Sequence, residues 1–177
     1  MSDAFKDEIV ALIPKLRAYA ISLTGSSAEA DDLVQEALMR AWSFRASFQA
    51  GTNGKAWLYR ILRNTFYTAA AKRRDTVQDI DGRLAAQLSC APDQEWRMAY
   101  DELLQALDQL GAETRDAVVL VVAAGLSYRE AADVCGVALG TMKSRVNRGR
   151  EQLLRLIGPA EPPPPTRSAP RAPAMFA

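Results

Sequence analysis

Residue types that carry covalent or metal chemistry are scarce in this chain. There is no His among the 177 residues, which excludes Ser-His and Cys-His catalysis and zinc sites that use imidazole. Cys90 and Cys135 lie 45 residues apart and suit neither a metal-ligand pair nor a disulfide framework. The segment GTNGK resembles part of a phosphate-binding loop, but its glycines are three rather than five residues apart, and Ala56 stands where Ser or Thr is needed. The sequence therefore predicts no enzyme, no metal or other cofactor, and no small-molecule substrate.

The chemistry that the sequence does offer comes from cations. Residues 54–74 hold six basic and no acidic residues, and residues 127–158 hold six basic and three acidic ones, although the formal net charge of the chain is +1. Two basic segments predict two contacts with a polyanion, and two solvated helix faces are the alternative. The first segment also mixes aromatic residues with its cations. This mixture suits single-stranded or melting DNA, because aromatic rings stack on exposed bases. Spacing alone equally allows Trp57, Leu58, Ile61 and Leu62 to be core.

Residues 127–157 have the organisation of a helix-turn-helix. A short helix, a turn at Gly136 and a longer basic helix follow one another. The longer helix has one apolar face, against which the first helix can pack while it crosses the DNA backbone. The Arg, Asn and Ser side chains of the longer helix can then reach phosphates and base edges. Gly149 falls between the apolar residues of this helix and adds little bulk, and as an exposed helical glycine it is expected to cost about 1 kcal/mol. A helical hairpin with a basic outer face is the alternative.

Helices are expected to position both basic segments, because apolar residues recur with helical periodicity almost throughout the chain. Ser26 with Glu29, and Ser127 with Glu130, fit the capping box that opens a helix. The segment 118–122 could also be a buried strand by composition, but a lone strand has no partner. The fold class is therefore all-α, with helices expected over 3–24 (kinked or divided at Pro14), from Ser26 through an apolar stripe of Leu33, Val34, Ala37, Leu38, Ala41 and Trp42, from Asn53 to about 74, from 95 or 96 to 110, over 113–124, from 127 to about 136, and over 139–157.

Breaks in this pattern divide the chain into two small helical domains. We expect a first domain over 1–75, a flexible acidic linker over 76–95, a helix-turn-helix domain over 96–158 and a disordered Pro-rich tail over 159–177. The longest apolar stretch, 117–126, has ten residues, whereas a membrane-spanning helix needs about twenty. The N-terminus carries acids where a secretory signal would carry Lys or Arg. The sequence thus predicts a cytoplasmic protein without membrane contact.

Three segments, DDLVQEALMRAW, AWLYRILRN and GLSYREAADVCGVALGTMKSRVNRGREQL, closely resemble regions two and four of extracytoplasmic-function (ECF) sigma factors of the sigma-70 family. These small bacterial subunits direct RNA polymerase to promoters. The resemblance extends over residues 5–157 in the expected order. FQAGTN, RNTFY, KRR and DIDGRLAAQL further resemble the alphaproteobacterial subgroup of the general stress response, called EcfG.

The resemblance implies a role for three sets of residues. The polymerase set, which would bind the clamp helices of core RNA polymerase, is Asp32, Gln35, Glu36 and Arg40. The minus-ten set, which would capture a flipped base and support strand opening, is Phe48, Thr52, Asn53, Lys55, Trp57, Tyr59, Arg60, Arg63, Asn64, Arg73 and Arg74. The minus-thirty-five set, which would read duplex DNA, is Thr141, Lys143, Ser144, Arg145, Asn147, Arg148 and Arg150.

The implied partners are core RNA polymerase, promoter DNA and an anti-sigma factor, which would be NepR-like if the chain is of the EcfG subgroup. Association with the nucleoid is expected when the protein is active. Leu58, Gly111 and Ala112 depart from residues that are common in related proteins, but none of them is a proposed contact. Three alternatives remain: a sigma-like decoy that sequesters an anti-sigma factor, a repressor that uses only residues 127–157, and an enzyme. The decoy does not require the basic aromatic helix, the repressor leaves DDLVQE without a role, and the enzyme has no evident carboxylate pair.

Overall fold

The computed structural model of the chain describes residues 3–45, 48, 53–76 and 94–158. These residues hold α-helices and a π-helix but no strand, which confirms the all-α prediction. Most of the expected linker and the whole of the expected tail lie outside the described residues. In chain order the elements are α1 (Asp3–Thr24), α2 (Ser27–Ser43), α3 (Gly54–Thr76), α4 (Gln94–Asp108), α5 (Ala112–Val118), the π-helix η2 (Val119–Ala123), α6 (Tyr128–Cys135) and α7 (Leu139–Ile157).

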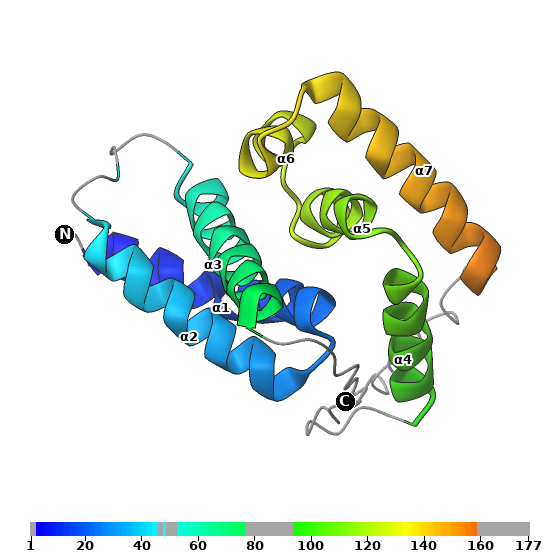
Figure 1. Cartoon of the computed structure of the whole chain (residues 1–177), viewed down its shortest axis with the longest axis horizontal. Helices are drawn as coiled ribbons and strands as arrows, with labels where there is room; N and C mark the ends of the chain where they lie inside the picture. The colour runs from blue at the N-terminus through cyan, green and yellow to red at the C-terminus, as the bar shows by residue number, and fades with distance from the viewer. Residues whose placement is uncertain (1–2, 46–47, 49–52, 77–93, 159–177) are drawn as a thin grey trace, which may run out of the picture.

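The first domain consists of α1, α2 and α3, which pack against one another (Figure 1). α1 is a single helix that contains Pro14, so the expected division at this residue does not occur. Gly25 ends the helix with a φ of +70°, a left-handed conformation that glycine adopts without steric cost. Within the expected stripe of α2, Leu33, Val34, Ala37 and Ala41 are buried and Leu38 is partly buried. Trp42 is 52% exposed, so its assignment to the buried stripe is wrong.

The second domain consists of α4, α5, η2, α6 and α7 (Figure 1). The expected single helix over 113–124 is instead α5 followed by η2, in which the amide of Ala124 bonds the carbonyl of Val119 at 2.9 Å. Segment 118–122 is thus helical and not a strand. Residues 139–157 form α7 with the expected bounds.

Helix ends follow the local sequence signals. The Ser127 hydroxyl accepts from the Glu130 amide at 3.2 Å, and the Glu130 carboxylate accepts from the Ser127 amide at 2.7 Å, which confirms the predicted capping box. The Ser26 hydroxyl accepts from the Glu29 amide at 3.4 Å at the start of α2. Asn53 caps α3, because its side-chain oxygen accepts from the Ala56 amide at 3.1 Å.

Gly149 lies on the buried side of α7, against α5. A Cβ atom built there would lie 2.4 Å from Val118 Cγ2 and 2.9 Å from Thr114 Cγ2, much closer than two carbon atoms can approach. The expectation that Gly149 is exposed is therefore wrong. Its missing side chain lets α7 pack on α5 beside the fully buried Met142 and Val146.

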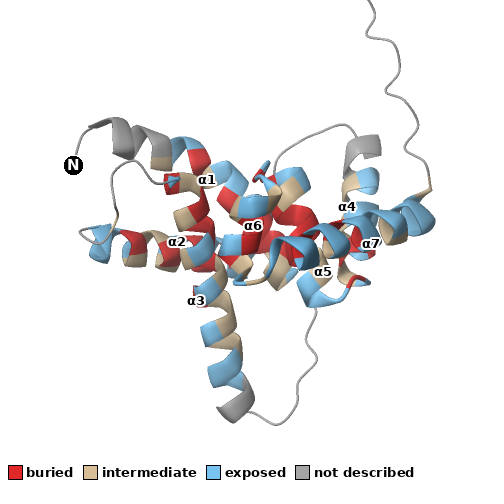
Figure 2. Cartoon of the chain, turned by 90° about the horizontal axis from the view of Figure 1, so that it is seen from above, coloured by how far each residue is buried: buried red, intermediate tan, exposed pale blue. Residues whose placement is uncertain are grey.

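The two domains pack against each other. Their buried apolar residues form one continuous cluster, which gathers where α1 faces the second domain (Figure 2). α1 contacts α5 and η2, and α3 contacts α6. The C-terminal end of α3 projects beyond the body of the molecule (Figure 2). Helix α3, which carries the first basic segment, is thus covered along part of its length by the second domain.

Candidate nucleic-acid and polymerase interfaces

One face of α3 lies against the second domain. Lys55, Tyr59, Arg63 and Tyr67 recur every four residues, which places them on the same side of a helix. We call them the α3 contact face. The ammonium group of Lys55 donates to the Gly125 carbonyl oxygen at 3.1 Å. Three of these four residues belong to the minus-ten set, so the surface predicted to meet DNA here meets the protein itself.

The centre of this contact is Asp116 of α5. Its carboxylate is 1% exposed and accepts three hydrogen bonds from the first domain. The Tyr19 hydroxyl donates to Oδ1 at 3.1 Å, and Arg63 Nε and the Tyr67 hydroxyl donate to Oδ2 at 2.8 and 3.0 Å. A buried carboxylate is costly unless it is paired and hydrogen-bonded, and both conditions are met here by residues of the other domain.

The pKa values of the groups around Asp116 agree with this burial. Desolvation and then the charge of Asp116 raise the pKa of Tyr19 well above its ordinary value, and the same two causes raise the pKa of Tyr67. Desolvation opposes the charge of Arg63, but the attraction and the hydrogen bond of Asp116 outweigh it and raise the Arg63 pKa. The two tyrosines therefore remain protonated donors and Arg63 remains a cation at neutral pH.

Tyr59 is fully buried, with its ring centroid 5.5 Å from that of Tyr19. Its hydroxyl has no hydrogen-bond partner among the described residues, and burial raises its pKa to about 12. Leu58 and Leu62 are also buried. The structure thus places part of the first basic segment in the core, as the alternative interpretation of its apolar residues anticipated.

The other described members of the minus-ten set lie nearer the surface. Asn53, Arg60, Asn64 and Arg73 are exposed. The rings of Phe48 and Trp57 pack with their centroids 5.1 Å apart, and both residues are partly buried. The Asn53 carboxamide nitrogen donates to Glu130 of α6. Thr52 and the side chain of Arg74 lie outside the described residues.

The outer face of α7 carries the minus-thirty-five set. Thr141, Lys143, Ser144, Asn147, Arg148 and Arg150 are all exposed on this helix. Arg145 differs, because its guanidinium pairs with Glu113 of α5 and its side chain is only 15% exposed. α7 therefore presents a polar and cationic face to solvent while Arg145 helps to fix the helix on α5.

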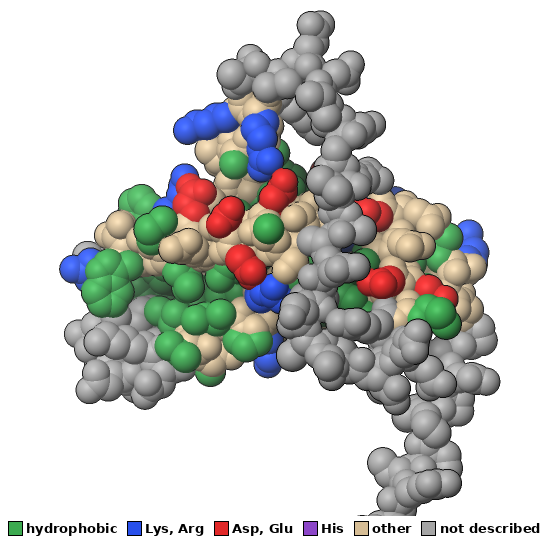
Figure 3. Space-filling view, turned by 90° about the horizontal axis from the view of Figure 1, so that it is seen from below, with side chains coloured by type: hydrophobic (Ala, Val, Ile, Leu, Met, Phe, Trp, Pro, Cys, Tyr) green, Lys and Arg blue, Asp and Glu red, His purple; other side chains and the backbone are tan. Residues whose placement is uncertain are grey.

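The polymerase set lies on α2. Asp32 and Gln35 are exposed, and Glu36 accepts from Arg40 at 2.6 Å, one helical turn away. Three large apolar residues near the end of the helix are also exposed: Met39 at 59%, Trp42 at 52% and Phe44 at 58%. Figure 3 shows acidic side chains beside hydrophobic ones on one face of the molecule. Exposed apolar groups rimmed by polar residues are typical of protein interaction sites.

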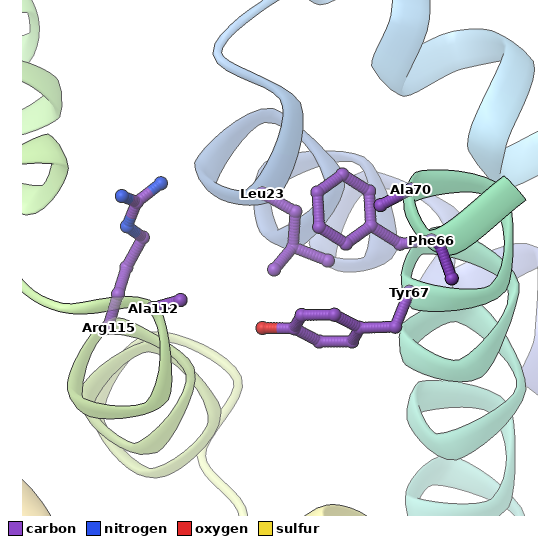
Figure 4. A pocket seen from close by; sticks show the side chains of 7 residues that line it. Leu23, Phe66, Tyr67, Ala70, Ala112 and Arg115 are labelled. Carbon is purple, nitrogen blue, oxygen red and sulfur yellow. The ribbon is translucent and has the colours of Figure 1, made fainter. Parts of the chain in front are cut away.

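A cavity of ≈ 430 Å³ lies between the domains, beside the Asp116 cluster. Leu23, Phe66 and Tyr67 line it from the first domain, and Ala112 and Arg115 line it from the second. Figure 4 shows the Tyr67 hydroxyl directed toward α5. The interface is thus incompletely packed on this side. The described residues contain no cluster of metal-ligating side chains, and their helices offer no segment of bilayer-spanning length and apolarity.

Sequence reasoning missed Asp116, Tyr19 and Tyr67. A signal for Asp116 was present, because this carboxylate directly precedes the apolar run that begins at Ala117. An acid on the buried side of a helix needs a partner, but the partner's identity depends on how the two domains dock. The sequence carries no local signal for that docking.

Comparison with known proteins places both domains in one family. The sequence profile of Sigma-70 region 2 matches residues 9–76, and that of Sigma-70, region 4 matches residues 100–153. Over 157 residues the chain is 48% identical to the ECF RNA polymerase sigma factor EcfG of Rhodopseudomonas palustris, covering 89% of this chain and 87% of the relative. It is 30% identical over 168 residues to the sigma factor CarQ of Myxococcus xanthus, covering 90% and 92% of the two chains.

Solved structures agree with these sequence matches. The sigma factor RpoE of Bartonella quintana, solved in complex with the anti-sigma factor NepR, superposes with a TM-score of 0.77 at 44% identity, covering 88% of this chain and 98% of that one. CnrH, solved with the cytosolic domain of CnrY, superposes with a TM-score of 0.66 at 25% identity, covering 87% of each chain. With both regions matched in order and close relatives covered over most of their length, the chain belongs to the sigma-70 family of transcription initiation factors, as an ECF sigma factor.

Proposed function

We propose that this sigma factor brings core RNA polymerase to its promoters through three surfaces, one for each of the residue sets defined above. The observation that carries the proposal is the presence of two cationic, DNA-compatible helices, α3 and α7, in separate domains. The polymerase set and the exposed apolar residues of α2 bind core polymerase. The domain boundaries at residues 75 and 96 are part of the same proposal.

The two DNA surfaces would act on different forms of the promoter. α7 docks in the major groove of duplex DNA, where exposed Asn and Arg side chains can read base edges. The minus-ten set holds unpaired bases, and a base held out of the helix cannot pair again, although unstacking it costs a few kcal/mol. Each domain alone binds weakly, and tethering both to one polymerase raises their effective concentration on the promoter.

An anti-sigma factor is the expected regulator. RpoE of Bartonella quintana was solved with NepR, and the identity to EcfG of Rhodopseudomonas palustris reaches 48%. Both similarities support a NepR-like partner and a role in the general stress response. The site of action is the cytoplasm, at the nucleoid when the protein is active.

A decoy that only sequesters an anti-sigma factor would not need the cationic surfaces. Lys143, Asn147 and Arg148 are exposed on α7, where they have no evident structural role. This exposure favours a protein that binds DNA over a decoy. The two functions also differ in outcome, because a decoy would bind the anti-sigma factor but would not support transcription.

Reconstitution with core RNA polymerase tests the proposal directly. We expect the purified chain to support run-off transcription from specific sites on a genomic template, and a NepR-like anti-sigma factor to suppress it. Core polymerase alone serves as the control. A chain that binds core polymerase but starts no transcript from any site would contradict the assignment of the DNA surfaces.

Replacing Asn53 should impair promoter opening more than initial binding. Asn53→Ala in the holoenzyme is expected to reduce permanganate reactivity of thymines in the opened region while leaving closed-complex affinity nearly unchanged. Because Asn53 also caps α3, loss of the cap could destabilise the helix by about 1 kcal/mol. Asn53→Ser separates the two effects, since Ser also caps helices but lacks the carboxamide. Footprints of Asn53→Ser equal to those of the original chain would rule out the base-capture role.

A further inference from the structure

The buried polar contacts around Asp116 join the two domains of the free chain in a way that covers part of one DNA surface and leaves the other accessible. On the first domain, Asn53, Lys55 and Arg63 bond groups of the second. On the second domain, the partners are Glu130, the Gly125 carbonyl and Asp116, none of which lies on α7. The exposed members of the minus-thirty-five set remain open to solvent.

We propose that Asp116 is an intramolecular latch, which holds the free chain closed with the α3 contact face covered and the outer face of α7 open to duplex DNA. The latch rests on the proposed function, because the residues it covers belong to the minus-ten set. Carboxylates and phosphates bind a guanidinium through the same charge-assisted hydrogen bonds. Arg63 therefore cannot bond Asp116 and a DNA phosphate with the same donor at the same time.

Two features favour reversible closure over a permanent fusion of the domains. The first is the cavity of ≈ 430 Å³ beside the cluster, because permanent interfaces are closely packed and largely apolar. The second is the buried Tyr59 hydroxyl, which has no partner among the described residues. Leaving a buried hydroxyl unpaired costs free energy, and exposure to water would remove that cost. Asp116 stabilises the closed state and Tyr59 opposes it, as expected for an element with two accessible arrangements.

Opening can be measured through the distance between the domains. Keto-bearing amino acids introduced at Met39 and Leu154, both exposed, can carry donor and acceptor dyes for single-molecule energy transfer without disturbing the cysteines. Asp116→Asn keeps the shape of the side chain but removes the charge that Arg63 requires. We expect this variant to shift the chain from its closed population to a second population with a different transfer efficiency.

The matched control is Asp31→Asn. Asp31 pairs with Arg17 at 2.5 Å within the first domain and is 55% exposed, so this variant makes the same change in net charge without touching the latch. The double variant Tyr19→Phe/Tyr67→Phe removes the two hydroxyl groups of the first domain that donate to Asp116. This variant replaces Asp116→Asn in the distance measurement if circular dichroism shows that Asp116→Asn is unfolded. Adding Tyr59→Phe to Asp116→Asn should restore part of the closed population.

Binding of two DNA probes tests what the latch covers. We expect Asp116→Asn to bind a fluorescein-labelled oligothymidylate about tenfold more tightly than the original chain does. A change in affinity of this size is typical where ligand binding is coupled to a conformational equilibrium. A mixed-sequence duplex should bind Asp116→Asn no more tightly than it binds Asp31→Asn, since α7 is open in both arrangements.

The outcomes separate the latch from the function on which it rests. An original chain that already populates the open distance, or latch variants that change neither distance nor single-strand affinity, would overturn the latch. Opening without a gain in single-strand affinity would support the latch and contradict the minus-ten assignment of the α3 contact face.

Discussion

Replacing Gly149 with Val is expected to lower the free energy of unfolding of the second domain by about 3 kcal/mol, the upper part of the range for overpacked cores. Even the Cβ atom would lie 2.4 Å from Val118 Cγ2 and 2.9 Å from Thr114 Cγ2. Val and Thr are β-branched and have few rotamers to move into, so α7 itself must shift away from α5. We expect denaturation followed by far-ultraviolet circular dichroism to show the loss, together with weaker upstream promoter recognition.

Gly140 in the same helix provides the control. A Cβ atom there would meet nothing within 4 Å, so Gly140→Ala should be neutral or should stabilise by up to about 1 kcal/mol through helix propensity. Gly149→Ala should fall between the two, because the same gain in propensity offsets part of the overlap. Equal stability of the Gly149 and Gly140 variants would show that the α5–α7 contact does not require glycine.

Replacing Arg148 with Ala is expected to weaken recognition of the upstream promoter element by roughly tenfold or more, since a good base contact of Arg contributes about 1–3 kcal/mol. Arg148 is exposed on α7, where its Nε donates to the Ser144 carbonyl oxygen one turn back, at 3.4 Å. The fold should therefore tolerate its loss. Competition between specific and mixed-sequence duplexes, followed by run-off transcription, measures the effect.

Arg155 is a close match for Arg148. It is exposed on the same helix, and its Nε donates to the Glu151 carbonyl oxygen at 3.2 Å, but it is outside the minus-thirty-five set. Arg155→Ala removes the same charge, so it should reproduce only the non-specific, salt-dependent part of the loss. If Arg148→Ala and Arg155→Ala lose equal affinity for specific and mixed-sequence DNA, Arg148 does not read the promoter.

Local sequence signals predicted the ends of several helices correctly. The Ser127 and Glu130 capping box, the Asn53 cap and the bounds of α7 depend on residues within one turn of each other, so the sequence alone reveals them. The π-helix η2 has no such signal, since its apolar residues suit an α-helix equally well. Trp42 satisfied the helical period of the apolar stripe, yet it is 52% exposed and its ring centroid lies 5.0 Å from the guanidinium carbon of Arg45.

The sequence allowed each surface of the candidate site to be predicted by itself, but not the contacts between these surfaces. Apart from Arg145, the cations of α7 and the acids of α2 lie on solvent-facing helix faces, as helical periodicity requires. The burial of Tyr59, the role of Asp116 and the need for glycine at 149 all depend on contacts between segments distant in the chain. Periodicity describes one helix at a time, so it gives no account of such contacts.

The π-helix η2 also determines the direction, about the helix axis, in which the residues that follow it face. Its wide turn, with the Ala124 amide bonded to the Val119 carbonyl, accommodates one residue more than an α-helical turn would. Each residue advances an α-helix by about 100°, so a regular helix in this place would deliver the chain to Gly125 rotated by roughly that angle. The Gly125 carbonyl and Glu130 would then face away from Lys55 and Asn53. The length of this segment, and not only its side chains, therefore aligns the two domains.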